Sequence, residues 1–342
     1  MKKILVPLTI CAALVLIVTS GCVQPAGKAA KPAVTTEKPA QPGKEAAKPE
    51  KPIMLKLKFT PQETTTYRVV TEAEKSVKFE GSMPTKTNIK GGKTGNTIDI
   101  TFTQRIESVD NKGNAIANIT FKKLKYLAKS KDTVTLDFDS SRAEDQKKPM
   151  NDLIGRSYKI ALTPAGQVSR IIDANEPPVN PEASIAEKIA FTMLLDPNSI
   201  KERHVIDALP ADKKELHVGD TWSRTRPLSF GLMGSKTYER TYTLKDVREA
   251  NGRQIAEVEM SGAAELKTDP NQTGSFHDMF DAIETYSGHL ELDVTSGKVE
   301  NCSEKLNSEW TAVQPDEEVK EGKKPIVMIM GTTLSWTTER VE

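Results

Sequence analysis

The strongest constraint on the fold of this chain is a regular alternation of apolar and polar side chains in several separate segments. Such a period of two residues puts the apolar side chains on one face of a strand, as in antiparallel sheets with one buried face. The alternating positions are Ile98, Ile100, Phe102 and Ile106, then Val134, Leu136 and Phe138, then Tyr158, Ile160 and Leu162, and finally Leu290, Leu292 and Val294.

Turn-forming residues separate these segments. They are Asp110–Gly113, Pro164–Gly166, Asn251–Gly252 and Ser296–Gly297. Asn, Asp and Gly accept the positive φ angles that tight hairpins require, so we expect antiparallel hairpins at these places. The continuous apolar run at 325–331 predicts a central strand that is buried on both faces.

Helical signals cluster between the strand-like segments. Asn180 followed by Pro181 predicts a helix start, and Ile185, Ile189 and Met193 then share one face with Thr192. Asp196-Pro197 ends this helix and begins a second one, which Pro210 ends. A single helical turn is expected from Pro149 to Ile154, closed by Gly155.

Two segments far apart in the chain repeat the same pattern. Residues 105–121 resemble residues 243–260, and the hairpin around Gly166 resembles the one around Gly297. Generic hairpin chemistry can produce either similarity alone, but their common order favours an internal duplication. We therefore predict an α+β fold, mainly antiparallel β, of two duplicated halves at 53–175 and 216–342 with a helical segment at 176–215 between them.

The first 22 residues carry a targeting signal. Lys2 and Lys3 precede an apolar stretch at 4–18, which is too short to span a bilayer and typical of a secretory signal peptide, here 1–21. Small residues directly before Cys22 resemble the lipobox of bacterial lipoproteins, although Thr19 stands where Leu is usual. The resemblance implies acylation of Cys22, such as with palmitate, and a stable lipid anchor. Ordinary signal cleavage with an incidental Cys22 is the alternative.

The signal segment and the residue after Cys22 also predict where in the cell the protein is located. The predicted anchor places the protein in the bacterial cell envelope, bound to a membrane through the acyl chains on Cys22. Val23 stands where an Asp would signal retention at the inner membrane, which favours the outer membrane facing the periplasm. The inner membrane and the cell surface stay open as alternatives.

A Pro-, Lys- and Ala-rich stretch follows Cys22. Residues 23–52 contain no aromatic side chain and cannot bury enough apolar surface to fold, so 22–52 is predicted to be a lipidated tether. Over the whole chain, Lys plus Arg number 48 and Asp plus Glu number 47. This balance gives no basic surface for nucleic acid, and a hydrophobic share of 37% excludes a multi-span membrane protein.

The body of the chain also resembles a known family. The segments 136–141, 153–171, 217–224 and 241–247 are similar to an uncharacterised family of bacterial lipoproteins, usually described as a domain of unknown function. The resemblance implies a lipid-anchored envelope protein with a β-rich body. It brings no established activity and no functional residues.

A search for catalytic and metal sites finds little. The chain has no nucleophile elbow, phosphate-binding loop or paired-cysteine motif. His277, Asp278, Asp281 and His289 are the one close His–carboxylate grouping, but their spacing matches no compact zinc pattern. Asp137, Asp139 and Asp145 lack the Gly and the final Glu of a calcium loop, so a solvated face is the better interpretation. We predict no metal and no cofactor.

Four further residues have two interpretations each. Cys302 is the one cysteine of the predicted folded region and is expected to be buried and inert rather than reactive. Trp222, Trp310 and Trp336 could stack on sugars or line a lipid cavity. Packing in the core of a sheet is the commoner role, and we expect it for Trp222 and Trp336.

The sequence therefore predicts a membrane-anchored lipoprotein that is not an enzyme. Its expected role is non-catalytic binding or scaffolding, with a lipid, another apolar ligand or an envelope protein as partner. A curved sheet with a helical lid would suit an apolar ligand, by analogy with lipoprotein carriers. The alternative is an envelope hydrolase that acts on glycan or peptide.

Overall fold

The structure is a computed structural model, and it describes residues 51–81, 91–173, 181–212, 215–230, 235–264, 281–313, 322 and 324–341. The predicted signal peptide, Cys22 and most of the predicted tether lie outside the described residues. The predictions about them are therefore not tested by the structure.

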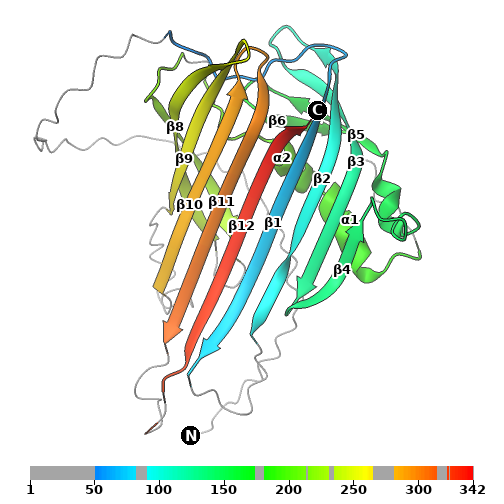
Figure 1. Cartoon of the computed structure of the whole chain (residues 1–342), viewed down its shortest axis with the longest axis vertical. Helices are drawn as coiled ribbons and strands as arrows, with labels where there is room; N and C mark the ends of the chain where they lie inside the picture. Colours follow the sequence, from blue (N-terminus) through cyan, green and yellow to red (C-terminus); the bar gives the residue numbers. More distant parts are fainter. Residues whose placement is uncertain are drawn as a thin grey trace, which may run out of the picture.

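Within the described residues the chain forms twelve strands, one 3-10 helix and two α-helices (Figure 1). The first half contains β1 (Thr64–Glu80), β2 (Gly92–Val109), β3 (Ala115–Ser130), β4 (Thr133–Asp139), η1 (Pro149–Leu153), β5 (Ser157–Leu162) and β6 (Val168–Ile172). The helices α1 (Ile185–Leu195) and α2 (Pro197–His204) follow. The second half contains β7 (Thr221–Ser229), β8 (Ser235–Ala250), β9 (Arg253–Ala264), β10 (Asp281–Asp293), β11 (Lys298–Val313) and β12 (Val327–Val341).

All strands belong to one antiparallel sheet, as the alternation predicts. Their order is β6-β5-β3-β2-β1-β12-β11-β10-β9-β8-β7, and β4 pairs with β3 beside this path. The first strand and the last strand meet in the middle, paired from Thr66 with Val341 to Glu80 with Val327. The two halves of the chain thus occupy the two sides of one sheet, and β1 with β12 joins them.

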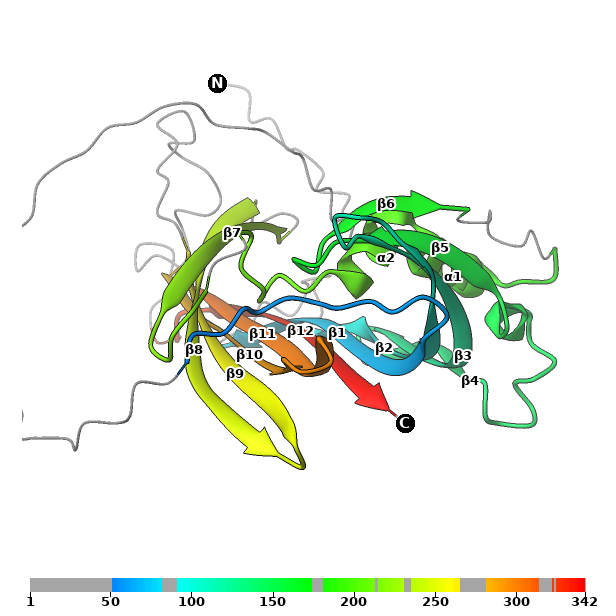
Figure 2. The same ribbon diagram turned by 90° about the horizontal axis from the view of Figure 1, so that it is seen from above.

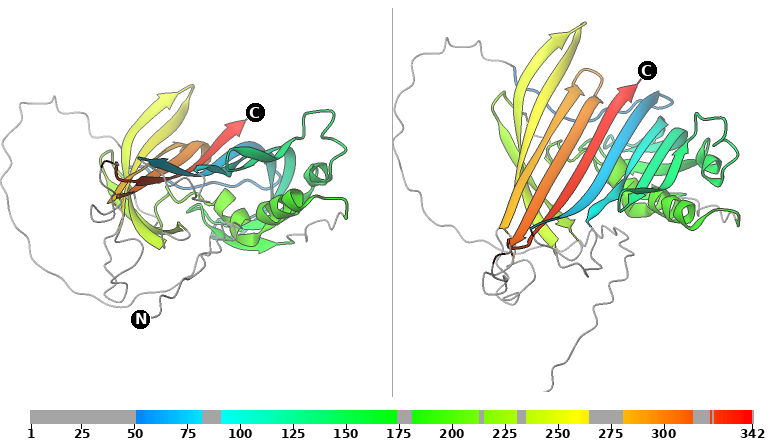
Figure 3. Two further views of the ribbon diagram at one scale, coloured as in Figure 1. Left: turned by 90° about the horizontal axis from the view of Figure 1, so that it is seen from below. Right: turned by 60° about the horizontal axis from the view of Figure 1, so that its bottom comes forward.

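The sheet is bent into a trough. Seen along the strands, β3, β5 and β6 curl over one flank and β7 curls over the other (Figure 2). The helices lie inside the concave side of the first flank, between β2 and the curled strands β5 and β6 (Figures 2 and 3). One face of the sheet is therefore covered in part, and the opposite face carries the polar side chains of the alternating pattern.

The alternating apolar residues form the core on the concave face. Ile100 and Phe102 of β2, Phe121 of β3, Leu290 of β10 and Leu306 of β11 are all fully buried. At about 25 cal/mol for each Å² of apolar surface removed from water, such side chains supply most of the driving force for closing the trough.

The helices differ in detail from the prediction. Helix α1 begins after Ser184, whose side chain caps the helix together with Glu187, and not after Asn180. Its buried side is formed by Ala190, Phe191 and Leu194, whereas Ile185 is 79% exposed. The expected apolar face at Ile185 and Ile189 is wrong because α1 packs through the side that also carries Glu187, which leaves Ile185 and Ile189 on the outer side of the helix. The second helix begins after the predicted Asp196, whose carboxylate accepts from the Ser199 amide.

The turn predictions are confirmed. Gly113, Gly166, Gly252 and Gly297 all have positive φ between 66° and 83° and lie in tight turns between paired strands. The one-turn helix at Pro149–Leu153 is present, and Gly155 follows it with a φ of 85°.

The apolar run at 325–331 contributes to the predicted central strand, β12, which lies between β1 and β11. Its residues Val327 to Gly331 are only half-buried, so burial on both faces is wrong. This end of β12 extends beyond the helices, where no second layer formed by the described residues covers the concave side (Figure 1).

The hairpins that resemble each other in sequence have bulges at matching positions. In the β2–β3 hairpin Glu107 has no opposite partner, and in the β8–β9 hairpin the matching Lys245 has none. The bulges of the β5–β6 and β10–β11 hairpins likewise fall at the matching residues Ser169 and Glu300. A bulge fixes where a strand bends, so each hairpin bends at the same point as its counterpart.

Burial differs between the two hairpins at one matched pair. We expect both Ile116 and Ile255 in the interior, but Ile116 is only half-buried while Ile255 is buried. Ile116 lies on the face opposite Ala115 and Ala117, which are buried against the concave core. The expectation for Ile116 is therefore wrong.

Residues 53–62 form an extended arm that crosses the end of the trough (Figure 2). Ile53 pairs with Leu216 between the helices and β7. The Leu57 amide donates to Pro164 in the β5–β6 turn, and the Lys58 amide donates to Gly297 in the β10–β11 turn. The arm therefore joins the corresponding turns of the two halves, directly after the predicted tether.

Substitution of Gly297 tests whether the arm packs tightly on the β10–β11 turn, and the same substitution of Gly252 is the matched control. Both have φ near +70°, so alanine costs about 1–2 kcal/mol of backbone strain at either place. A Cβ at Gly297 would also overlap the backbone of Lys58, whereas one at Gly252 meets no atom within 4 Å. We expect Gly297→Ala to lower the free energy of unfolding by about 1–3 kcal/mol more than Gly252→Ala in urea titrations. Equal losses would show that the arm does not press on this turn.

Candidate functional site

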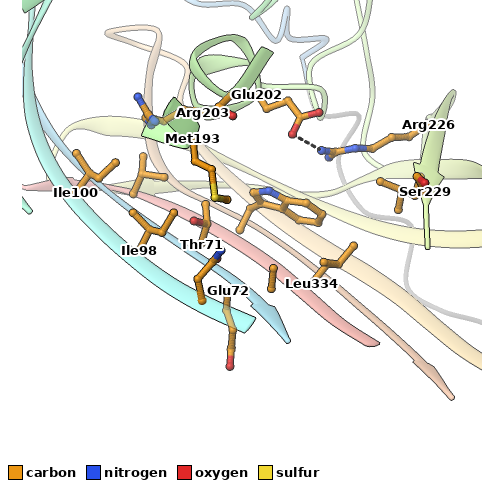
Figure 4. A pocket seen from close by; sticks show the side chains of 16 residues that line it. Thr71, Glu72, Ile98, Ile100, Met193, Glu202, Arg203, Arg226, Ser229 and Leu334 are labelled. Atoms are coloured by element: carbon orange, nitrogen blue, oxygen red, sulfur yellow. Dashed lines mark ion pairs between the residues drawn. The ribbon is translucent and has the colours of Figure 1, made fainter. Parts of the chain in front are cut away.

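The candidate site is a cavity of about 150 Å³ between the floor of the trough and the helices (Figure 4). Apolar side chains dominate its floor: Ile98 and Ile100 come from β2, and Leu334 and Trp336 come from β12. Met193 of α1 forms part of the roof. The alternation places all four floor residues on the concave face, because each is an even number of residues from the next on its strand.

Two charged residues lie at one side of this cavity. Glu202 comes from α2 and Arg226 comes from β7, and their side chains point toward each other (Figure 4). The Arg226 guanidinium is centred 4.4 Å from the centre of that ring, a close cation–π contact. Glu72 also borders the cavity, but its side chain points away from it (Figure 4).

Arg226 belongs to a buried network of charges behind the cavity. Its Nη1 lies 3.3 Å from an oxygen of Glu304, whose carboxylate also lies 3.1 Å from Nη1 of Arg240. Arg240 is 1% exposed and makes a second pair, at 2.8 Å, with Asp207 just beyond α2. The Tyr286 hydroxyl donates to Glu304 over 2.8 Å. This network connects β7, β8, β10 and β11 to the helical segment.

The three carboxylates of this network, Glu202, Asp207 and Glu304, are stabilised to different degrees by their arginine partners. Burial would raise the pKa of Asp207, but the charge and hydrogen bond of Arg240 lower it below its ordinary value. Burial raises the pKa of Glu202, and Arg226 offsets this only in part. The separation between Arg226 Nη2 and Glu202 Oε2 is 3.9 Å, too long for a hydrogen bond. Glu202 is therefore the least well stabilised of the three carboxylates.

His204 at the end of α2 is buried against the floor of the trough. Its Nε2 lies 2.7 Å from the Tyr158 hydroxyl, and its ring meets Phe102 edge to face. Arg203 donates to the same hydroxyl over 3.0 Å. Burial lowers the pKa of His204 well below its ordinary value, and the Arg203 charge acts in the same direction. His204 is therefore neutral in the folded protein near pH 7.

The structure does not assemble the predicted His–carboxylate grouping. His277 and Asp278 lie outside the described residues. Asp281 and His289 both belong to β10 and are about 26 Å apart along that strand. Across the described part of the chain, no three His, Cys, Asp or Glu residues are placed to hold a metal ion.

The three aspartates considered for calcium are held by cations of the chain. Asp145 is fully buried, with its carboxylate 2.6 Å from Arg142 and 2.5 Å from Lys148. The interpretation of a solvated face is therefore wrong for Asp145, because these two pairs and the Asp139 amide compensate its burial. Asp137 is exposed and pairs with Arg142.

The three tryptophans all lie in the core or against it. Trp310 is 1% exposed in the core, and Trp222 stacks on Tyr242 with an angle of 13° between the rings. Trp336 is half-buried and packs against the core, as expected, and it also borders the cavity. Cys302 is a free cysteine packed against the core, and burial raises the pKa of its thiol, consistent with the inert interpretation.

Comparison with known proteins leaves the family of the chain open. No family model matches the sequence, and no curated protein matches it. Among solved structures, the chain is similar to the one titled "Lipid-protein interactions in lipovitellin", with 10% sequence identity and a TM-score of 0.36. The match covers 83% of this chain and 26% of that one. The chain therefore spans about a quarter of the protein it matches.

Among the described residues, neither α1 nor α2 is long and apolar enough to cross a membrane.

The buried histidine predicts a pH dependence of stability. The unfolded chain binds a proton at this side chain near pH 6.5, and the folded chain does not until a lower pH. Stability should therefore be fully present above about pH 6.5 and fall as the pH falls, by at most about 1.4 kcal/mol per pH unit. Urea unfolding at pH 7.5 and 5.5 measures how much the free energy of unfolding falls between these pH values. We expect a smaller fall for His204→Gln, which keeps an acceptor for Tyr158, than for the unaltered protein. The same loss in both proteins would contradict a neutral His204.

Proposed function

We propose that the protein is a non-catalytic binding protein of the bacterial envelope that holds an apolar ligand beneath its helices. The observation that carries this proposal is the cavity between the floor of the trough and α1–α2, with its floor of Ile98, Ile100, Leu334 and Trp336. Apolar cavities with one polar side suit ligands that have an alkyl or aromatic part and one polar group.

The volume limits the size of the ligand. A cavity of about 150 Å³ accommodates a molecule of roughly the size of benzene, or about six carbon atoms. A longer alkyl chain would continue along the trough toward the uncovered end of β12. A whole phospholipid would require the helices to move, so we favour a ligand with a single chain.

The charge network favours binding over hydrolysis. A hydrolase of glycan or peptide would need one carboxyl group as an acid and a second free carboxylate or nucleophile near it. Glu202 has a raised pKa, but Asp207 and Glu304 are both held by Arg240 at 3.1 Å or less. Within the described part of this network, the two carboxylates besides Glu202 are therefore not free, which supports binding over the envelope hydrolase.

We also propose that Cys22 anchors the protein to the membrane through acyl chains, with residues 23–52 as the tether. The arm at 53–62 supports this arrangement, because it enters the fold across the end of the trough and hydrogen-bonds to turns of both halves. The tether would then present the trough close to the bilayer.

We infer, as a further part of this proposal, that the two halves arose by duplication. The matching bulges at Glu107 and Lys245 and at Ser169 and Glu300 support the inference. The order β6-β5-β3-β2-β1 also corresponds to β11-β10-β9-β8-β7, with β12 between the two sets. A single ligand site then arises because the helices cover only one half of the trough.

A matched pair of threonines tests the ligand site. Thr71 borders the cavity on β1, and Thr337 lies on the opposite face of the adjacent strand β12. We expect Thr71→Phe to fill the cavity and weaken binding of 1-octanol at least tenfold. Thr337→Phe should leave the affinity within twofold, as measured by calorimetry on the full chain in lipid nanodiscs with empty nanodiscs as reference. Unchanged affinity in Thr71→Phe would place the ligand elsewhere.

Replacement of Cys22 tests the anchor. Cys22→Ala removes the thiol that would carry the acyl chains, so we expect loss of labelled palmitate from the protein and its release from the membrane fraction. Cys302→Ala serves as control and should keep both label and membrane association, because that thiol lies within the folded body. Label retained in Cys22→Ala would refute lipidation at this residue.

A further inference from the structure

We propose that Arg226 binds the carboxylate of the ligand and that Glu202 occupies this position in the ligand-free protein. The ligand class is then an alkyl carboxylate with its chain in the cavity and its acid group on β7. This inference rests on the proposed function, because it specifies the ligand of the same cavity.

The position of Arg226 is the first argument. Its guanidinium lies over the edge of the apolar floor, 4.4 Å from the centre of the Trp336 ring, and it lines the cavity itself. A chain lying on Ile98 and Leu334 would therefore bring its polar end to this guanidinium. Arg is also the side chain best suited to bind a carboxylate with two parallel hydrogen bonds.

Arg226 has donor capacity left for such a ligand. A guanidinium carries five N–H donors in a fixed plane. Within the described residues, Nη1 of Arg226 donates to Glu304 over 3.3 Å, whereas Nη2 makes no hydrogen bond and lies 3.9 Å from Glu202. A carboxylate that approached Nη2 to about 2.8 Å would form the hydrogen bond that Glu202 does not.

A ligand carboxylate can displace Glu202 from its position beside Arg226. Two arginines, Arg226 and Arg240, meet three carboxylates in this network, so one carboxylate is left without full compensation. Burial raises the pKa of Glu202, and the charges of Asp207 and Asp196 raise it further against Arg226 and Lys201. Its side chain is still 25% exposed and can turn to solvent. Exchange of Glu202 for a ligand carboxylate keeps the charge of the network unchanged.

The position of Glu202 on α2 gives the exchange a structural consequence. Glu202 is a contact between the roof of the cavity and β7, and α2 is also held through His204, which contacts Tyr158 of β5 and Phe102 of β2. A bound carboxylate would break the first contact and leave the second. The roof would then remain attached while its side nearest β7 opens.

The experiment compares three eight-carbon probes that differ only in their end group. Octanoate, 1-octanol and octylamine are titrated by calorimetry into the full chain in lipid nanodiscs, with empty nanodiscs as reference. We expect octanoate to bind at least tenfold more tightly than 1-octanol, and octylamine more weakly than both. Arg226→Gln should remove the preference for octanoate and keep the affinity for 1-octanol. Glu202→Gln should tighten octanoate binding severalfold.

Two controls separate recognition from folding. Arg226→Lys keeps the charge and should retain part of the preference, and Arg248→Gln removes an arginine that pairs with Glu291 on the outer face and should change nothing. Equal affinities of octanoate and 1-octanol in the unaltered chain would overturn the inference and leave the apolar site standing. Tighter binding of octylamine would assign recognition to Glu202 instead. Absence of binding by all three probes would overturn the proposed function as well.

Discussion

The pairing of the first strand with the last is the interaction on which the rest of this structure depends. β1 and β12 pair without interruption over fifteen residues in the middle of the sheet, and each also pairs with the inner strand of its own half. Without this pairing, each half would expose a long edge strand, which is a site for aggregation. Because the closing contact joins residues about 270 positions apart, the full sheet forms only after most of the chain is synthesised.

A single bent sheet of long strands has more concave surface than the two helices can cover. The two helices have 11 and 8 residues, which at 1.5 Å per residue gives about 17 and 12 Å of length, and they cover only the first half of the trough. Strands of 15 to 18 residues are three to five times as long. The cavity follows from this mismatch, because floor residues near α1 and α2 are only partly met by side chains of the roof.

Much of the fold could be predicted from the sequence because its signals are local. The alternation of apolar residues predicts the strands, and Asp196-Pro197 predicts the start of α2. Gly166 and Gly297 predict the turns, where both have a positive φ in the structure. The predicted start of α1 is wrong because Ser184 and Glu187 form a capping box that begins the helix later than Asn180-Pro181 would. The length of the trough that stays uncovered, which leaves β12 half-buried at one end, depends on contacts between distant segments and has no local signal.

The candidate site was harder to predict, although one signal was present. Arg226 shares its strand face with Trp222 and Leu228, and Arg240 shares its face with Tyr238 and Tyr242. Charged side chains at apolar positions of an alternating strand mark buried charges, and such charges need partners. Those partners, Glu202, Asp207 and Glu304, come from other elements, and sequence spacing does not indicate which of the many acidic residues they are.

The buried charges are also informative about function. A buried ion pair contributes little to stability compared with apolar side chains of the same volume, because removing charges from water costs several kcal/mol for each ion. Arg240 satisfies two carboxylates at 3.1 Å or less, so it fixes the helical segment on the sheet with good geometry. Arg226 pairs with Glu304 and lies over Trp336, but it does not reach such geometry with Glu202, at 3.9 Å. The proposed ligand carboxylate would complete the pairing of Arg226 at the edge of the cavity.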